Sequence, residues 1–161
     1  MSMIGHLVIT DASRFLAAEH DDETFGALLE EAESSTDSHL DIGKAWHAIH
    51  FLLTGTEWDT KGIGGLAILG GREIGEDQGY GPARLLTPDQ VRQTADALST
   101  LSIPELMKKY RGKVFNASQI YPQSWSDDSA DVTYIESNFL AVVSFYRKAA
   151  QEGMSILLYL S

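Results

Sequence analysis

Two short apolar runs at opposite ends of the chain limit the folds that are open to it. Residues 3–10, MIGHLVIT, and residues 154–161, MSILLYLS, each have the length and the bulky, partly β-branched side chains of one strand. The second run is apolar throughout, which is typical of a strand inside a sheet. Because neither run has a clear strand pattern next to it in sequence, we expect the two to pair with each other.

The residues between these runs show mainly helical periodicity. Apolar side chains recur every three or four residues over 22–34, 88–101 and 127–150. Strands at both ends with helices between them predict an α+β fold, in which one small, mostly antiparallel sheet includes the N- and C-terminal strands and is covered by several helices. The length of 161 residues suits one hydrophobic core, and no linker or repeat divides it, so we expect a single domain over residues 1–161.

Specific residues mark two of the predicted helix boundaries. Thr87, Pro88 and Gln90 have the spacing of a capping box with proline at the first helical position. The helix that follows is expected to turn Val91, Ala95, Leu98 and Leu101 toward the core. Gly112 is expected to end a further helix over 102–112, and residues 113–125, KVFNASQIYPQSW, are expected to form an aromatic-rich connector.

Eight of the 14 glycines fall within residues 62–81, GIGGLAILGGREIGEDQGYG. A phosphate-binding loop would need Gly-Lys-Ser or Gly-Lys-Thr, which is absent, and a dinucleotide fingerprint would need glycine where Ala67 stands. The acidic residues that follow, among them Glu73, would repel phosphate. The segment is therefore predicted to be a loop with tight turns, a helical turn at 66–69 and a strand at 72–74.

Residues 40–56, LDIGKAWHAIHFLLTGT, form a predicted helix that carries one tryptophan and two histidines on or beside its apolar stripe. Asp41 is expected to cap its start and Gly55 its end. At about 100° per residue, His50 falls within the apolar stripe and His47 at its edge. A metal site, a proton-transfer group and a packed histidine are all open readings of this pattern.

A metal site is the weakest of these readings. Zinc needs three or four ligands, and paired helical histidines usually stand four residues apart, whereas His47 and His50 are three apart. The favoured reading is a buried His50 that donates one hydrogen bond to a backbone carbonyl or to Tyr121. The alternative is a ligand-binding cleft of amphipathic side chains. Its candidate residues are Trp46, His50, Thr54, Tyr121 and Trp125.

The residues disfavour the common catalytic arrangements. The chain has no cysteine and no Gly-x-Ser-x-Gly elbow. The acidic cluster Asp127, Asp128 and Asp131 lacks the spacing and the glycine of a calcium loop. We therefore predict no catalytic residue, no metal and no cofactor, and a non-enzymatic role is favoured over an enzymatic one.

The net charge of the chain limits the kinds of partner that we expect. Twelve Lys and Arg stand against 23 Asp and Glu, a net charge of −11, which disfavours nucleic acids and anionic membranes and favours a basic protein partner. The N-terminus has no signal-peptide pattern and no run is long enough to cross a bilayer, so a cytoplasmic location is expected. The leading hypothesis is a protein-binding or regulatory module, for instance one that neutralises a toxin. The alternative is a small-molecule-binding protein or cryptic enzyme with a pocket around Trp46, His50 and Tyr121.

Several segments together resemble the YfbM-like family of small bacterial proteins of unknown function. The resemblance covers nearly the whole chain and rests on Met3–Gly5, on Leu40, Asp41, Lys44, Trp46, His50, Leu53, Thr54 and Gly55, on LGG near Gly70, on Tyr80–Val91 and on Ile120–Pro122. It implies a compact, stand-alone α+β domain and supplies neither catalytic residues nor a substrate. In the family pattern position 50 is characteristically histidine and position 47 is not, so the resemblance also speaks against a metal held by His47 and His50.

Overall fold

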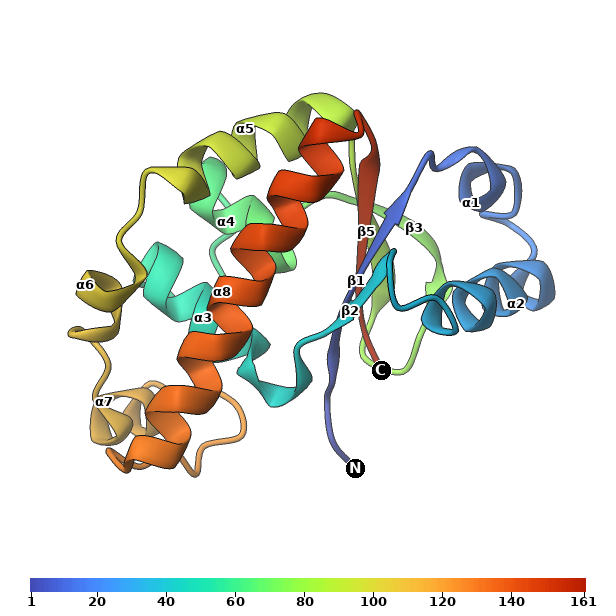
Figure 1. Ribbon diagram of the computed structural model, residues 1–161. Helices are drawn as coiled ribbons and strands as arrows, with labels where there is room; N and C mark the ends of the chain where they lie inside the picture. The colour runs from blue at the N-terminus through green and yellow to red at the C-terminus, as the bar shows by residue number, and fades with distance from the viewer.

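One five-stranded antiparallel sheet runs through the computed structural model, which describes residues 1–161 apart from the side chain of Ile63 (Figure 1). The strand order is β2-β1-β5-β4-β3. The strands are β1 Gly5–Thr10, β2 His39–Asp41, β3 Arg72–Asp77, β4 Pro82–Leu86 and β5 Ser155–Leu160. The predicted α+β fold is confirmed.

The two terminal strands pair with each other, as expected. All six residues of β1 are in antiparallel register with β5, from Gly5 opposite Leu160 to Thr10 opposite Ser155. β5 is the middle strand and is buried along its whole length. A strand with both faces covered needs apolar side chains at every position, which explains the uninterrupted run.

Helices cover both faces of the sheet (Figure 1). Those on one face are α1 Ser13–Ala17 and α2 Asp22–Glu33. Those on the other are α3 Trp46–Thr54, α4 Gly62–Leu69, α5 Pro88–Ser99, α6 Ile103–Met107, α7 Gly112–Ala117 and α8 Ser129–Gln151. Each face has its own core: Leu7 belongs to the larger one and Val8 to the smaller, because successive strand residues point to opposite sides.

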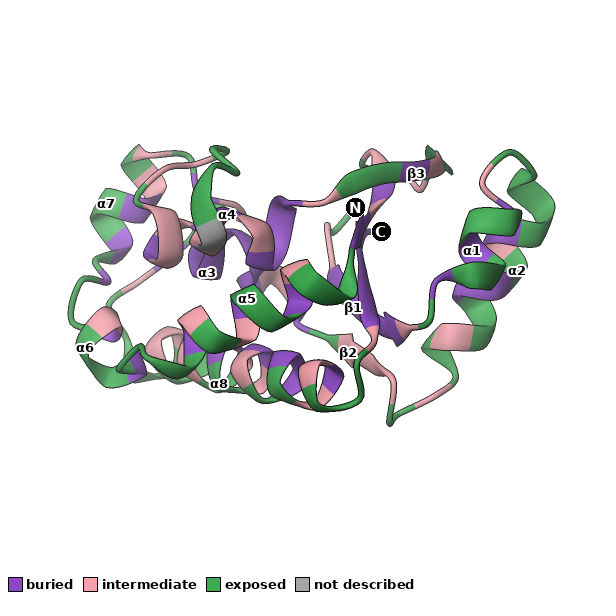
Figure 2. Cartoon of the chain, turned by 90° about the horizontal axis from the view of Figure 1, so that it is seen from above, coloured by how far each residue is buried: buried purple, intermediate pink, exposed green. Residues whose placement is uncertain are grey.

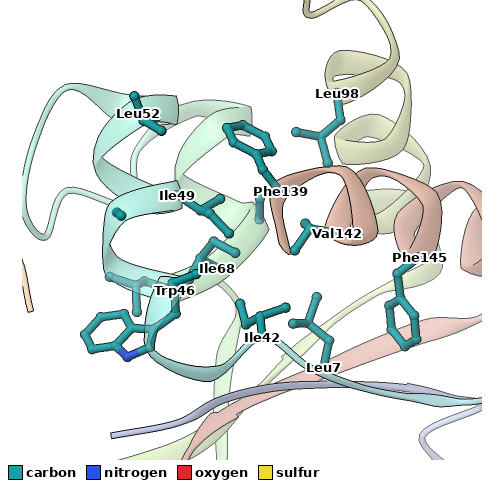
Figure 3. Packing of buried hydrophobic residues seen from close by; sticks show 14 of the residues in the cluster. Leu7, Ile42, Trp46, Ile49, Leu52, Ile68, Leu98, Phe139, Val142 and Phe145 are labelled. Atoms are coloured by element: carbon teal, nitrogen blue, oxygen red, sulfur yellow. The ribbon is translucent and has the colours of Figure 1, made fainter. Parts of the chain in front are cut away.

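The larger core forms where α3 and α8 meet. Figure 3 shows Ile49 of α3 facing Phe139 and Val142 of α8, with Leu7 of the sheet below them. Figure 2 shows that the buried residues of α8 lie on one side of the helix. The helical periodicity predicted over 127–150 is therefore confirmed.

The start of α3 differs from the prediction. Asp41 lies in β2 and does not cap the helix, because its Oδ1 accepts a hydrogen bond from the backbone N of Gly43 at 2.7 Å. Gly43 has φ of +54° and opens a short 3₁₀ turn, after which α3 begins at Trp46. The predicted end is confirmed, since Gly55 is left-handed and its N–H donates to the carbonyl of Phe51.

The glycine-rich segment contains a complete helix where a loop with one helical turn was predicted. α4 begins at Gly62 and packs against α3. A Cβ atom on Gly65 would stand 2.4 Å from the carbonyl carbon of Thr60, and one on Gly64 would stand 3.1 Å from the carbonyl oxygen of Leu53. The glycines therefore allow a close approach of backbones, and this packing overrides their low helix propensity.

Two further predictions about helices were wrong. Gly112 begins α7 instead of ending the preceding helix, and its N–H donates to Oδ1 of Asp127 at 2.7 Å. Leu101, expected to point inward, lies beyond the end of α5 and is 37% exposed. The capping box at Thr87 and Gln90 is confirmed. Tertiary contacts decide these details, whereas a local cap does not depend on them.

In the part of the chain that the structure describes, no helix combines the length and the apolar character needed to cross a membrane. The cytoplasmic location stays a prediction.

Candidate functional site

His47 lies between two tryptophans, which contradicts its predicted place at the edge of the helix. Its ring is 4.6 Å from that of Trp46 at an interplanar angle of 7°, and 4.5 Å from that of Trp58 at 41°. Only 1% of the residue is exposed. Trp58 comes from the segment after α3 and folds back over the helix, and this tertiary contact is what buries the imidazole.

Both ring nitrogens of His47 are used. The backbone N–H of Tyr121 donates to Nδ1 at 2.9 Å, so the ring proton is on Nε2, which donates to the carbonyl of Glu57 at 2.9 Å. Burial lowers the pKa of His47, and the Glu57 carbonyl opposes this more weakly. The neutral ring therefore ties α3 to two loops that are distant in sequence.

Three of the five predicted ligand-binding residues meet beside this stack. The rings of Trp46 and Tyr121 are 5.9 Å apart and nearly parallel. Trp46 Nε1 donates to the carbonyl of Met3 at 3.2 Å, and the Tyr121 hydroxyl accepts from the N–H of Met3 at 3.0 Å. Trp125 Nε1 donates to the carbonyls of Ile120 and Tyr121, each at 3.1 Å. Their polar atoms thus hold the N-terminal segment and the 118–125 loop in place.

The other two predicted residues lie farther along α3. The Thr54 hydroxyl donates to the carbonyl of His50 at 2.9 Å, one turn back in the helix. Thr54 lines two surface clefts, and Trp46, His50 and Tyr121 line neither of these two. A ligand site shared by all five residues stays a prediction.

His50 is buried without the hydrogen bond that was expected of it. It is 0% exposed, and neither ring nitrogen has a partner among the described residues. Burial lowers its pKa to about 4; His47 and Arg84 act in the same direction, and the backbone of Asp59, close to the ring but outside hydrogen-bond geometry, opposes them. The ring is therefore neutral at pH 7.

An open cleft lies on the outer side of the His47 stack. It has a volume of about 330 Å³ and is lined by Glu57, Trp58, Ala117, Ser118, Gln119 and Gln123. Trp58 is 63% exposed, the largest exposure of any Trp, Tyr or Phe among the described residues. We call this surface the Trp58 cleft. An exposed indole held against a buried ring is a rigid, flat apolar platform.

The far wall of the Trp58 cleft is held in an unusual backbone conformation. Gln119 and Gln123 have φ of 57° and 64°, which non-glycine residues rarely adopt. Such residues persist only where their surroundings hold them, and they cluster at functional sites. Here Asn116 accepts from the N–H of Trp125 at 2.9 Å and donates to its carbonyl at 2.8 Å, which closes the loop.

Sequence reasoning missed the residues of this cleft. Trp58 stands alone in the polar segment TGTEWDTKG, and an isolated tryptophan among polar residues is the signal that could have indicated a surface role. The two glutamines carry no local signal, because their conformation depends on the loop's tertiary contacts.

Residues 1–159 match the family described as a domain of unknown function, DUF1877. The chain belongs to this family. Protein YfbM of Escherichia coli (strain K12) is 30% identical over an alignment of 169 residues that covers 95% of each protein. The crystal structure of YfbM, described as a protein of unknown function from Escherichia coli, superposes with a TM-score of 0.77 at 24% identity and covers 98% of this chain and 99% of its own. The expected resemblance to YfbM-like proteins is confirmed, and the structural match supports the fold.

Among side chains that the structure describes, no group of three or more His, Asp or Glu is arranged to hold a metal ion. The acidic residues just before α8 and in its first turn have structural partners. Asp131 accepts from the N–H and the hydroxyl of Ser126, at 2.8 and 3.0 Å, and Asp127 accepts from Gly112.

Proposed function

We propose that this DUF1877 protein is a non-enzymatic binding module that docks a basic segment of another protein in the Trp58 cleft. The exposure of Trp58 carries the proposal. A tryptophan that is 63% exposed leaves a large apolar surface in water, although its ring is fixed in place by His47. Tryptophans presented in this way are the residues that most often dominate binding energy at protein interfaces.

The negative charge of the protein favours a ligand whose cationic group lies above the face of the Trp58 indole. Glu57 lines the same cleft, and the whole chain carries a net charge of −11. A Lys or Arg side chain above a tryptophan face is attracted by the ring, by about 0.5–1 kcal/mol at an exposed site and more when water is excluded. The acidic surface would in addition speed the approach of a basic partner.

The rest of the cleft offers hydrogen-bonding groups suited to a peptide. Gln119 and Gln123 supply amides that both donate and accept, and Ser118 supplies a hydroxyl. Because the loop that bears them is closed by Asn116, these groups are held before a ligand arrives, which lowers the entropic cost of binding.

The bonding of His47 supports a role in binding over one in catalysis. Its imidazole contacts Trp58 and Glu57 of the cleft, and each of its nitrogens already has a backbone partner. A general base needs a nitrogen within reach of the substrate proton. His47 therefore supports the tryptophan without taking part in proton transfer.

Short peptides of one residue type test this proposal. We expect fluorescently labelled hexa-arginine and hexalysine to bind the protein, hexaglutamate to show no binding, and the affinity to fall as salt rises. Trp58→Ala should weaken binding of the basic peptides by about two- to fivefold. Tyr80→Ala removes a different exposed aromatic ring, 36% exposed, and should leave binding unchanged. Equal binding by the Trp58→Ala protein would overturn the proposal.

The second candidate function is a small-molecule site beside Trp46, His50 and Tyr121. The observation that favours it is that His50 is fully buried with both ring nitrogens unpartnered among the described residues. Native mass spectrometry of the protein purified from its own cells tests it. An added mass of a few hundred daltons that is lost in His50→Leu would support this site, and the bare 17.7 kDa chain would speak against it.

A further inference from the structure

His6 and His39 form a polar cluster on the opposite side of the sheet from the larger core. His6 of β1 stands opposite Tyr159 of β5 on one side and opposite Asp41 of β2 on the other. The His6 and Tyr159 rings stack at 4.7 Å, and His39 lies on β2 two residues before Asp41. The cluster thus crosses from the middle of the sheet to its edge strand.

The two imidazoles point their nitrogens directly at each other. His6 Nδ1 and His39 Nε2 are 3.0 Å apart, while the ring centres are 5.2 Å apart and the planes differ by 20°. With these separations the two nitrogens lie on the line that joins the rings, as in a straight N–H···N hydrogen bond. A shared metal ion would instead require both lone pairs to converge on a point beside that line.

The other ring nitrogen of His6 also has a polar neighbour, and charged groups surround the pair. His6 Nε2 and the Ser161 hydroxyl are 2.8 Å apart. The Tyr159 hydroxyl donates to Oε1 of Glu33, at the end of α2, at 2.6 Å. Burial lowers the pKa of His6, and His39 lowers it further, whereas Asp41 and Glu33 raise it. From α8, Lys148 donates to the carbonyl of Asp37, just before β2.

We propose that the His6–His39 pair is a proton-sensitive latch that holds the edge strand β2 on the sheet and releases it in acid. One of the two facing nitrogens must carry a proton and the other must not. When both are protonated the hydrogen bond is lost, and two positive charges face each other at the same place. β2 has only three residues, so a side-chain bond to His39 adds to a short ladder of backbone hydrogen bonds.

Release of β2 would uncover the backbone of β1. The N–H of Ile9, which now donates to the carbonyl of Ser38, and the carbonyl of Gly5, which accepts from Ile42, would both lose their partners. An uncovered strand edge is a template for pairing with another strand. The latch would therefore connect pH to the availability of a sheet edge.

The direction of the pH effect follows from linkage. Because the pKa of His6 is lower in the folded protein than in the unfolded chain, the latch is fully closed above about pH 6.5. It weakens as the pH falls from there toward the lowered pKa of His6. Each unit by which that pKa is lowered corresponds to about a tenfold change in the closed-to-open ratio.

Amide hydrogen exchange between pH 7.5 and pH 5, corrected for intrinsic rates, tests the latch. We expect the protection of the Ile9 and Ile42 amides to fall toward pH 5 while that of amides in the middle of α8 stays constant. In His39→Gln the amide can donate to neutral His6 or accept from protonated His6, so protection at Ile9 and Ile42 should depend on pH less than in the parent protein. His20→Gln, at a histidine whose side chain is 91% exposed, should behave like the parent protein.

Three outcomes would overturn the proposal. One is constant protection of Ile9 and Ile42 across the range in the parent protein. Another is the same pH dependence in His39→Gln as in the parent. The third is an equal loss of protection in α8, which would indicate global unfolding in place of a local opening of the edge strand.

Discussion

The indole of Trp58 rests on the imidazole of His47 with ring centres 4.5 Å apart, and the imidazole rests in turn on Trp46 at 4.6 Å. The outer ring is exposed and the inner two are buried. The stack therefore connects the surface of the protein to its larger core through a single histidine, whose two nitrogens fix it to backbone on either side.

Replacing His47 should cost more stability than replacing an exposed histidine. His47→Ala removes two partly buried hydrogen bonds and takes away the side-chain partner of the Tyr121 N–H and of the Glu57 carbonyl. We expect a loss of about 2–4 kcal/mol in the free energy of unfolding, measured in urea. His20→Ala is the control, and equal stability of the two variants would contradict the account of the stack.

Replacing His50, in contrast, should change the free energy of unfolding only slightly. Because both of its buried ring nitrogens lack partners among the described residues, His50→Leu removes polar groups that gain nothing from folding. At pH 7.5 we expect the free energy of unfolding to change by less than about 1 kcal/mol. A loss of about 3 kcal/mol or more would show that the ring has a polar partner in solution.

The lowered pKa of His50 predicts that stability will depend on pH differently in the parent protein and in His50→Leu. The pKa of His50 is lowered to about 4 in the folded protein, so its neutral form favours folding above the ordinary histidine pKa of about 6.5. That contribution is lost as the pH falls from about 6.5 toward 4. Urea titrations at several pH values should therefore show a flatter profile for His50→Leu than for the parent protein. Parallel profiles would contradict the lowered pKa.

Two glycine substitutions should have opposite effects. Gly65→Ala places a Cβ 2.4 Å from the backbone of Thr60, where neither chain segment can easily move, and should lower the thermal midpoint by several degrees. Gly26→Ala lies within α2 with no atom within 4 Å of the new Cβ, and should stabilise the protein by about 0.5–1 kcal/mol. Calorimetry of both variants measures the two effects.

The capping box offers a local test. Thr87 accepts from the N–H of Gln90, and Gln90 Oε1 accepts from the N–H of Thr87 at 2.9 Å. Thr87→Ala should cost about 1 kcal/mol, whereas Thr87→Ser should keep most of the stability. A Ser variant as unstable as the Ala variant would indicate that the methyl group, and not the cap, is the stabilising element.

The structural features that the sequence determined by itself are those whose surroundings are local or fully apolar. The cap at Thr87 and the left-handed Gly55 follow from short patterns, because helix capping involves near neighbours. The β1–β5 pair follows from two apolar runs, each of which has no clear strand pattern next to it in sequence. The same holds for the inward face of α8, where Phe139 and Val142 recur at helical spacing.

The tertiary structure alone decided how the polar and aromatic residues are used. Periodicity places His47 at the edge of a helix, but Trp58, eleven residues later, folds over it and buries it. Spacing cannot show that the N–H of Tyr121 reaches Nδ1 of His47 from 74 residues away, or that Gly65 must lie against Thr60. A polar side chain takes its role from whichever distant group the fold brings within hydrogen-bond distance, and a local pattern does not contain that distance.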